Sequence, residues 1–575
     1  MGGRASDFVQ QLNSQFGVME AQRAPYDAVW SKVAMYESEH MNMFTSQPNA
    51  HSDTFLALRR DPKDVDNTAR QAISIFSSGM LSGVSPPSDQ WFRLKVADVS
   101  GGEDKYKWRH IASYLEKLER IFMADFTAKN FYSQQVSSYK NIGLYGIQCM
   151  YIGYNSDIGT YYKDISPDEI YVANDYAGRV NCVFRRIQIT MQQAIELFGR
   201  NNLSVTRQRQ IDTPGFDPQS TMDIIHAVYK KSPGFENILS GNQLPFASFY
   251  FEPGEDHLIS EEGYQSMPYI VTRAYSDSRT PYSISPGTVA LSDVLMVNQL
   301  KLLMLQAGQL SIAPPVLMPD RGLVGRLNYK PSAVNLYRKD ATTSADDFRP
   351  LNITGDFQLS MQLLQMAQSD IKNAFFVDLF LMIHNRVSNG QGTPTATEIQ
   401  QLATEKSFLL APILINQQQE NFNNTFSRVY ELMYDQPNRL PPLPDDLRGT
   451  ELEIRYEAPL VRAQQAVQTQ GILQSLQEMA GIAQVYPSVV DVLDPDLVVR
   501  RVLENRGMPQ SFVKEVEEVL MERKQRAEAQ QQEKEAMAAQ AQQTALLQGY
   551  EGLSKAPETG SPAGTMLQQM TGGAI

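Results

Sequence analysis

The sequence contains few of the residues from which metal sites, disulfide frameworks and catalytic triads are built. It has two cysteines, Cys149 and Cys182, and six histidines in 575 residues. Two scattered thiols cannot form a disulfide framework or a four-thiolate zinc site, and they fit a reducing compartment. We interpret each histidine as a surface or hydrogen-bonded core residue, because none has the paired spacing of metal ligands. The histidines are His40, His51, His110, His226, His257 and His384.

Motifs of nucleotide-binding and hydrolytic enzymes are also missing. The chain has no G-x-x-x-x-G-K-[ST] loop, no G-x-G-x-x-G fingerprint, no H-E-x-x-H and no G-x-S-x-G. Carboxylate clusters are present, but such clusters are routine in exposed loops, and none has a diagnostic spacing. We therefore expect no catalytic residue, metal or cofactor, and keep a metal-dependent hydrolase or nuclease as the alternative. The clusters are Asp61/Asp64/Asp66, Glu255/Asp256, Glu261/Glu262 and Asp346/Asp347.

Basic residues are in the minority, with 51 Lys and Arg against 64 Asp and Glu, and the net charge is −13. Tight binding to nucleic acid normally rests on a basic patch that neutralises phosphates. Here Lys and Arg are dispersed, so if DNA is a partner we expect no tight static binding. An acidic surface would repel the phosphates, which suits a passage through which DNA slides. The aromatic residues between 151 and 184 have few interleaved cations, so we favour core packing over base stacking.

Long uninterrupted apolar runs are missing as well. None reaches the ~18 residues of a membrane-spanning helix, so we expect no membrane span and no membrane partner. What the sequence does have is two long helical patterns, at residues 286–312 and 356–389, separated by a short insert punctuated by Pro and Gly. Both are apolar on more than one face yet retain Gln, Asn and Asp. Helices of this kind suit the wall of an oligomeric tube or ring.

The remaining pattern predicts an α+β body over the first 280 residues, followed by mainly helical sequence. A third long helix is expected from Thr395 to Tyr434, bent at Pro412. The Gln/Ala/Glu-rich run at residues 514–547 is either a solvated helix or a coiled coil, and the Gly/Pro/Ser-rich end is expected to be disordered. Further helices are expected at 7–40, 64–81, 106–130, 131–145 and 190–199, and strands at 91–96, within 147–189, and at 222–229, 246–252, 267–274 and 451–456.

Five segments in order along the chain resemble a known family. The most specific lies within residues 67–96, where Pro86-Pro87-Ser88-Asp89-Gln90-Trp91-Phe92 occurs. The others are residues 291–320, 375–380, 393–406 and 456–466. Together they resemble the head-to-tail connecting, or portal, proteins of short-tailed bacteriophages. The resemblance covers about residues 10–530.

The resemblance implies an α+β, mainly α, portal fold assembled as a ring of twelve copies around a channel. It implies a wing at residues 1–285, stem helices at 286–312 and 356–386, a clip at 313–355 and a tunnel loop at 387–394. It also implies a return helix and strand at 395–458, a crown at 459–510, a helical crown or barrel extension at 511–550 and a disordered tail at 551–575.

The implied function is that of a portal at one capsid vertex of the virion, made in the host cytoplasm. Viral double-stranded DNA is then packaged and ejected through the channel, and the ring nucleates capsid assembly. The implied partners are the terminase large subunit, the tail adaptor, the major capsid and scaffolding proteins, and internal core or ejection proteins. A tail adaptor ring is a weaker alternative, because adaptors are usually much shorter.

Three groups of residues follow as candidate sites. Stem residues expected at subunit interfaces are Met296, Leu303, Leu310, Phe375 and Leu379. Clip residues expected to dock the motor and adaptor are Arg321, Arg326, Lys330, Arg338, Lys339, Asp346 and Asp347. Channel-facing residues are Arg386, Val387, Ser388, Asn389, Gly390, Gln391, Gly392 and Thr393.

Overall fold

The computed structural model describes most of the chain in two compact units. One unit comprises Met1–Ala97 and Leu115–Val498, and the other Asp98–Tyr114 and Val499–Ile575. Helices and sheets both contribute, which confirms the α+β class. The described residues are 2–38, 64–96, 109–231, 244–255, 257–277, 279–320, 328, 330–338, 349–350, 357–385, 409–436, 439–444, 447, 452–458, 475–479, 496, 498–499, 502–503 and 516–554.

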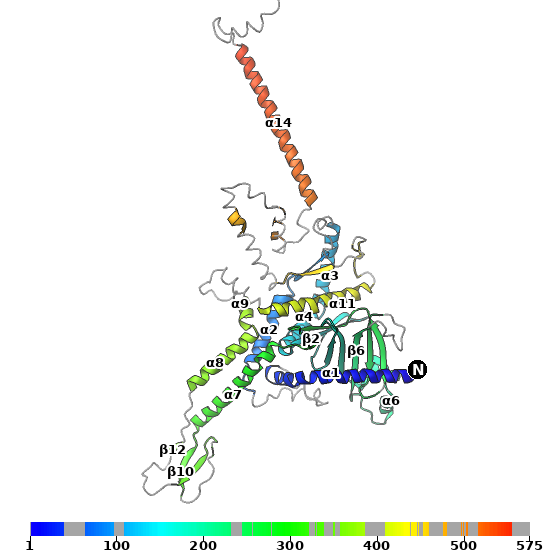
Figure 1. Cartoon of the computed structure of the whole chain (residues 1–575), viewed down its shortest axis with the longest axis vertical. Helices are drawn as coiled ribbons and strands as arrows, with labels where there is room; N and C mark the ends of the chain where they lie inside the picture. Colours follow the sequence, from blue (N-terminus) through cyan, green and yellow to red (C-terminus); the bar gives the residue numbers. More distant parts are fainter. Residues whose placement is uncertain are drawn as a thin grey trace, which may run out of the picture. The chain divides into compact units, whose positions relative to one another are not determined.

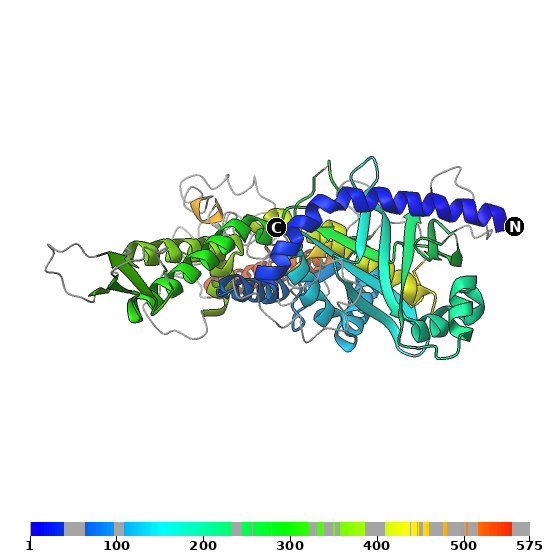
Figure 2. The same cartoon turned by 90° about the horizontal axis from the view of Figure 1, so that it is seen from below.

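An antiparallel five-stranded sheet and the first helix form one core of the body. The strand order is β4-β5-β6-β7-β8, and α1 (Gly2–Glu37) lies along the sheet (Figure 2). Phe8, Leu12 and Phe16 of α1 recur every four residues, so they share a helix face and pack on the sheet. Buried Tyr171 and Phe184 lie in the same core, in agreement with core packing of the aromatic segment. The strands are β4 (Ile170–Asn174), β5 (Val180–Thr190), β6 (Thr221–Lys230), β7 (Phe246–Phe251) and β8 (Leu258–Tyr264).

Two smaller sheets complete the body. In one, β2 (Ile147–Asn155) pairs with β3 (Gly159–Ile165) and β9 (Tyr269–Arg273). In the other, β1 (Phe92–Val96) pairs antiparallel with β13 (Leu452–Tyr456). The predicted strands are thus present. One further strand, β8, was not predicted, because Glu261 and Glu262 interrupt the apolar alternation of this edge strand.

The short helices of the body follow local signals. The predicted helix at 190–199 is α5 (Met191–Phe198), where Thr190 and Gln193 form a capping box. The other helices are α2 (Thr68–Val84), α3 (Arg109–Ala128), α4 (Phe131–Tyr145), η1 (Arg200–Asn202) and α6 (Val205–Asp212).

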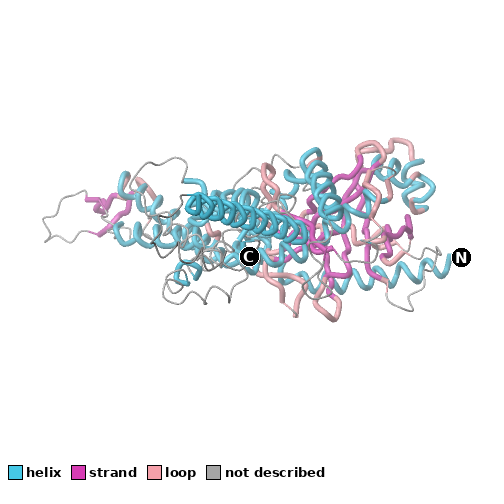
Figure 3. The backbone as a smooth tube through the Cα atoms, turned by 90° about the horizontal axis from the view of Figure 1, so that it is seen from above, coloured by secondary structure: helices cyan, strands magenta, loops and turns pink. Residues whose placement is uncertain are grey.

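The first long helical pattern is present as α7 (Pro286–Ile312), which packs beside α8 (Phe357–Ala374) (Figure 1). The predicted β-rich insert follows α7. In it β10 (Val316–Asp320) pairs in parallel with β11 (Val334–Arg338) and antiparallel with β12 (Arg349–Pro350), apart from the strands of the body (Figure 3). Among the described helices, α7 is long and apolar enough to cross a membrane by length and composition. The expected absence of a membrane partner therefore stays a prediction.

The expectation of one continuous helix from residue 356 was wrong. The segment is divided into α8 and α9 (Val377–Asn385), and Phe376 between them has a φ of 55°. A bulky residue rarely adopts a positive φ, so packing must hold it there. Phe380 of α9 lies 5.8 Å from the ring of Phe76 in α2, and the break allows this contact.

The third long helix contains an irregularity that was not predicted, and the expected bend at Pro412 stays a prediction. Pro412 lies inside the α-helical residues 409–416, and the irregularity comes later, in the π-helical segment η2 (Gln417–Phe422) that leads into α11 (Asn423–Tyr434). The predicted capping pair Thr395 and Glu398 lies outside the described residues.

In the second unit, the Gln/Ala/Glu-rich run forms α14 (Val516–Ser554). Its described side chains are almost all exposed, as in a solvated helix. The expected disordered tail was placed too early, since residues 551–554 are helical. The rest of that tail, residues 555–575, lies outside the described part.

Candidate assembly surface

The start of α7 is held tightly against the body. Ser285 caps the helix, since its Oγ accepts a hydrogen bond from Thr288 N at 2.8 Å and donates one to Leu144 O at 2.7 Å. A Cβ at Gly287 would lie 2.9 Å from Leu144 O and 2.7 Å from Oε2 of Glu37. The helix therefore begins in contact with the end of α4, at a distance that glycine alone permits.

A second attachment lies about three turns further along α7, at Asn298. The side-chain oxygen of Asn298 accepts hydrogen bonds from the backbone N–H groups of Val65 and Asp66, at 2.8 and 2.9 Å. Lys301 forms an ion pair with Asp66, which also accepts a hydrogen bond from Gln368 of α8 at 3.1 Å. Burial alone would raise the pKa of Asp66, but the hydrogen bonds from Lys301 and Thr68 lower it. Asp66 therefore joins α7, α8 and the segment before α2.

The later part of the second long helical pattern, around the boundary between α8 and α9, is buried within the chain. Phe375 is 0 % exposed and Leu379 is 2 % exposed. The ring of Phe380 fills the space beside Gly79, where an added Cβ would clash with it. Phe375 and Leu379, which we had assigned to a subunit interface, are thus core residues of the chain itself.

Along their length, α7 and α8 also leave apolar side chains exposed. The buried residues of α7 all lie between Pro286 and Asn298, and Leu303 is 52 % exposed. Leu310 is partly buried. We call the exposed set the hairpin face, and exposed apolar side chains gathered on one pair of helices are typical of a surface that contacts another protein. The hairpin face comprises Val289, Leu295, Met296, Leu303, Leu305 and Ile312 of α7 and Leu359, Met361, Leu363 and Met366 of α8.

The predicted clip and channel residues are described only in part. Lys330 is exposed, and Arg338 stands opposite Asp320 in the register of β11 and β10. The other clip residues lie outside the described part: Arg321, Arg326, Lys339, Asp346 and Asp347. The channel-facing residues from Arg386 to Thr393 also lie outside it.

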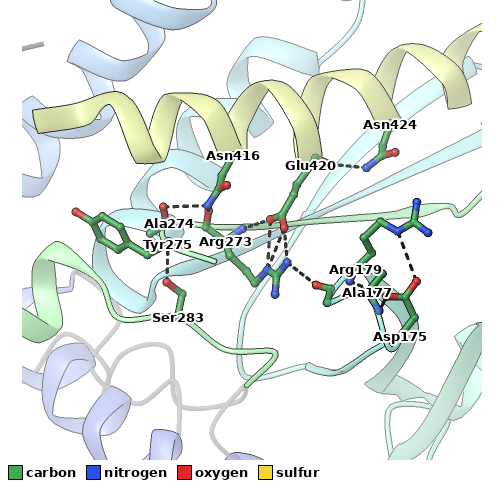
Figure 4. Close-up of polar contacts among 11 residues, drawn as sticks. Asp175, Ala177, Arg179, Arg273, Ala274, Tyr275, Ser283, Asn416, Glu420 and Asn424 are labelled. Atoms are coloured by element: carbon green, nitrogen blue, oxygen red, sulfur yellow. Dashed lines mark hydrogen bonds and ion pairs between the residues drawn. The ribbon is translucent and has the colours of Figure 1, made fainter. Parts of the chain in front are cut away.

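Sequence reasoning missed a polar attachment between the body and the helix that includes η2 (Figure 4). Glu420 accepts hydrogen bonds from the backbone N–H and the Nε of Arg273, at 2.9 and 3.1 Å. Asn416 donates to the carbonyl oxygens of Arg273 and Ala274, at 3.2 and 3.3 Å. The available signal was the spacing of Asn416, Glu420 and Asn424 every four residues, which places them on one helix face.

The described residues contain no group of three or more His, Cys, Asp or Glu that could hold a metal ion. In one acidic cluster, Asp66 is paired with Lys301 and Asp64 with Arg70 at 2.7 Å. Burial, and secondarily the charge of Arg185, lowers the pKa of His226 to about 3. Its ring nitrogens contact the hydroxyls of Tyr269 and Ser248 at 2.6 and 2.9 Å, so it is a hydrogen-bonded core residue.

Burial also raises the pKa of both cysteine thiols. It raises the pKa of Cys149, which is fully buried, although the charge of Arg185 opposes this. It raises the pKa of Cys182 to about 12. Thiols of this kind stay protonated at neutral pH and are poor nucleophiles.

Comparison with known proteins agrees with the sequence resemblance. The family model "Bacteriophage head to tail connecting protein" matches residues 9–513. A "Probable portal protein" of Bordetella phage BPP-1 is 26% identical over 552 residues, which cover 96% of this chain and 95% of the relative. A "Portal protein" of Salmonella phage epsilon15 is 25% identical over 569 residues, which cover 98% of each chain.

Proposed function

The chain belongs to the family of bacteriophage head-to-tail connecting proteins, and from that premise we propose that its copies form a ring-shaped portal at one vertex of a phage capsid. Viral double-stranded DNA is packaged and ejected through the central channel of this ring. The portal names of both relatives support this function. The role is structural, and the protein belongs to the virion.

The hairpin face is the observation that carries the proposal. The base of the α7–α8 hairpin is fixed by Ser285, Asn298 and Asp66, yet its outer part exposes leucines and methionines that one subunit leaves unburied. Exposed apolar side chains are stabilised when a neighbouring copy covers them. In a closed ring, the hairpin face of every copy contacts a second, different surface of the neighbouring copy. No copy then leaves its hairpin face uncovered. Twelve copies is the number that the family resemblance implies.

The portal regions are assigned accordingly. The body to residue 285 is the wing, α7 and α8 with α9 are the stem, and the sheet of β10, β11 and β12 belongs to the clip. Residues 387–394 are the tunnel loop and 395–458 return through the wing. Residues 459–510 are the crown, and α14 is its helical extension.

Partners follow from this assignment. The clip, with its exposed Lys330, docks the terminase large subunit during packaging and the tail adaptor afterwards. The wing contacts the major capsid and scaffolding proteins, and internal core or ejection proteins bind on the capsid side. All of these contacts are proposals for this chain.

Negative-stain electron microscopy of the purified protein tests the proposal directly. We expect rings with a central hole, and class averages give the number of copies. Compact particles without a hole at all protein concentrations would contradict ring assembly. They would reopen the alternative of a hydrolase, which a nuclease assay with Mg²⁺ and Mn²⁺ would then address.

A further inference from the structure

An open pocket of about 390 Å³ lies between α3 and the segment of residues 439–441. Its volume falls within the range of small-ligand sites. The chain as a whole carries a net charge of −13, yet the described residues that line this pocket include three cations and no carboxylate. The lining residues are Lys117, Arg120, Ile121, Arg439, Leu440 and Pro441.

Arg439 is positioned by a buried carboxylate. Its Nη2 donates a hydrogen bond to Oδ1 of Asp125 at 2.6 Å, and the Asp125 side chain is 1 % exposed. The other oxygen of Asp125 accepts a hydrogen bond from the hydroxyl of Tyr162 at 3.1 Å. A guanidinium group has five N–H donors, and this contact uses one edge of it. In the described part of the chain the other N–H groups of Arg439 have no hydrogen-bond partner, so they are available to a ligand in the pocket.

Lys117 and Arg120 lie one turn apart on α3, and both side chains are exposed. Neither forms an ion pair with another residue in the described part of the chain. The nearby Glu119 is directed elsewhere, because its carboxylate accepts hydrogen bonds from Leu94 N at 2.7 Å and Gln90 Nε2 at 2.6 Å. Glu119 therefore does not neutralise the two cations, and Glu116, the other adjacent acid on α3, forms no ion pair with either of them in the described part of the chain.

We propose that this pocket binds phosphate groups. Two guanidinium groups and an ammonium group around one cavity match the several oxygens of a phosphate, which arginine can bind through two parallel hydrogen bonds. The phosphates come either from the backbone of double-stranded DNA or from a free polyphosphate. The DNA source rests on the proposed function, whereas the polyphosphate source does not.

The test compares two double variants of the full-length protein with the same change of charge. Lys117→Gln/Arg120→Gln alters the pocket, and Arg209→Gln/Lys230→Gln alters two exposed cations of the body outside its lining. All four residues are exposed, so both variants should fold, which circular dichroism checks. Binding of a fluorescein-labelled DNA duplex is followed by anisotropy at several salt concentrations, and binding of sodium tripolyphosphate by calorimetry.

We expect the pocket variant to bind at least one ligand about tenfold more weakly than the control variant. If DNA is the ligand, the slope of log K against log salt also falls by about 2, since two phosphate contacts are lost. A defect confined to tripolyphosphate identifies a free polyphosphate as the ligand. Equal binding by the two variants, for both ligands, would overturn the proposal. Ring formation is scored separately by microscopy, so failure of the portal assignment and failure of the pocket are distinguishable.

Discussion

The carboxylate of Glu420 binds both the backbone N–H and the guanidinium group of Arg273, and so fastens η2 to β9. The side chain of Arg273 is 2 % exposed and that of Glu420 is 20 % exposed. Arg273 also donates to Gly178 O at 2.9 Å, at the turn between β4 and β5. Through this ion pair and this hydrogen bond, Arg273 connects β9 with η2 and with the turn after β4, which are far apart in the sequence.

Replacement of Glu420 by alanine should lower the free energy of unfolding by about 3 kcal/mol, because it leaves a buried guanidinium group without its counter-charge. The double variant Arg273→Met/Glu420→Met should lose less than the sum of the two single changes. Urea denaturation followed by tryptophan fluorescence measures both. The matched control is Asp223→Ala, which removes the partner of the half-exposed Arg186 and should cost less than about 1 kcal/mol. Similar losses for Glu420→Ala and Asp223→Ala would show that the Arg273 pair has no special importance.

Glu37 should make the protein less stable as the pH rises. Burial raises the pKa of its carboxyl well above the ordinary value of 4.5, although the charge of Arg70 opposes this. The folded state therefore holds a proton that the unfolded state releases above about pH 4.5. The free energy of unfolding then falls as pH increases from that value to the folded-state pKa, and is constant above it.

The variant Glu37→Gln should remove this component of the pH dependence. Unfolding free energies measured in urea between about pH 4.5 and pH 8 test it. Glu196→Gln, at an exposed position of α5, serves as the control and should retain the slope of the unaltered protein. An unchanged slope in Glu37→Gln would mean that Glu37 is ionised in the folded protein.

Two glycines of α7 should respond in opposite ways to substitution by alanine. Gly308→Ala should stabilise the helix by about 1 kcal/mol, because nothing lies within 4 Å of the added methyl group. Gly287→Ala should destabilise the subunit, because the methyl group would meet the fixed carbonyl of Leu144. Thermal unfolding monitored by circular dichroism compares them. If both variants shift the melting temperature in the same direction, the close contact at the start of α7 is not a constraint.

The ends of α7 could be predicted because their signals are local. Ser285 and Pro286 are typical of a helix start, and Pro314-Pro315 stops helical sequence just beyond Ile312. The break after α8 could not be predicted in this way. The apolar spacing continues through Phe375 and Phe376, and it carries no sign of the contact that Phe380 makes with Phe76 of α2, far away in the sequence.

The candidate interface residues could not be assigned from local sequence either, because their burial depends on residues far away in the sequence. Periodicity identified Leu303 and Phe375 as apolar positions, but it cannot tell a residue covered by its own chain from one left exposed for a neighbour. In the structure Leu303 is exposed and Phe375 is buried. The pocket beside α3 was missed because Arg439 comes from a Pro-rich connection more than 300 residues further along the chain.

The segment predicted from the sequence to be the tunnel loop, residues 387–394, should matter for DNA rather than for assembly. Its sequence from Val387 to Pro394 is polar, uncharged and contains two glycines, so it can contact passing DNA without gripping it. Deletion of Asn389 to Gly392 should leave ring formation intact but reduce the amount of genome that virions package or retain. Normal amounts of full-length genome in virions of this variant would contradict a channel-facing role.

The hairpin face and the core beneath it should give different defects when a carboxylate is introduced. Leu303→Asp places the charge on an exposed position, so the subunit should fold with an unchanged melting temperature while ring assembly is lost. Phe375→Asp buries an unpaired carboxylate at a cost of several kcal/mol, so the subunit itself should unfold. Mass photometry measures assembly and circular dichroism measures folding. Leu197→Asp, which alters an exposed leucine of α5, should leave both unchanged. Intact rings of Leu303→Asp would mean that neighbouring copies do not meet on the hairpin face at this position, because a carboxylate in an apolar interface would be as costly between subunits as within one.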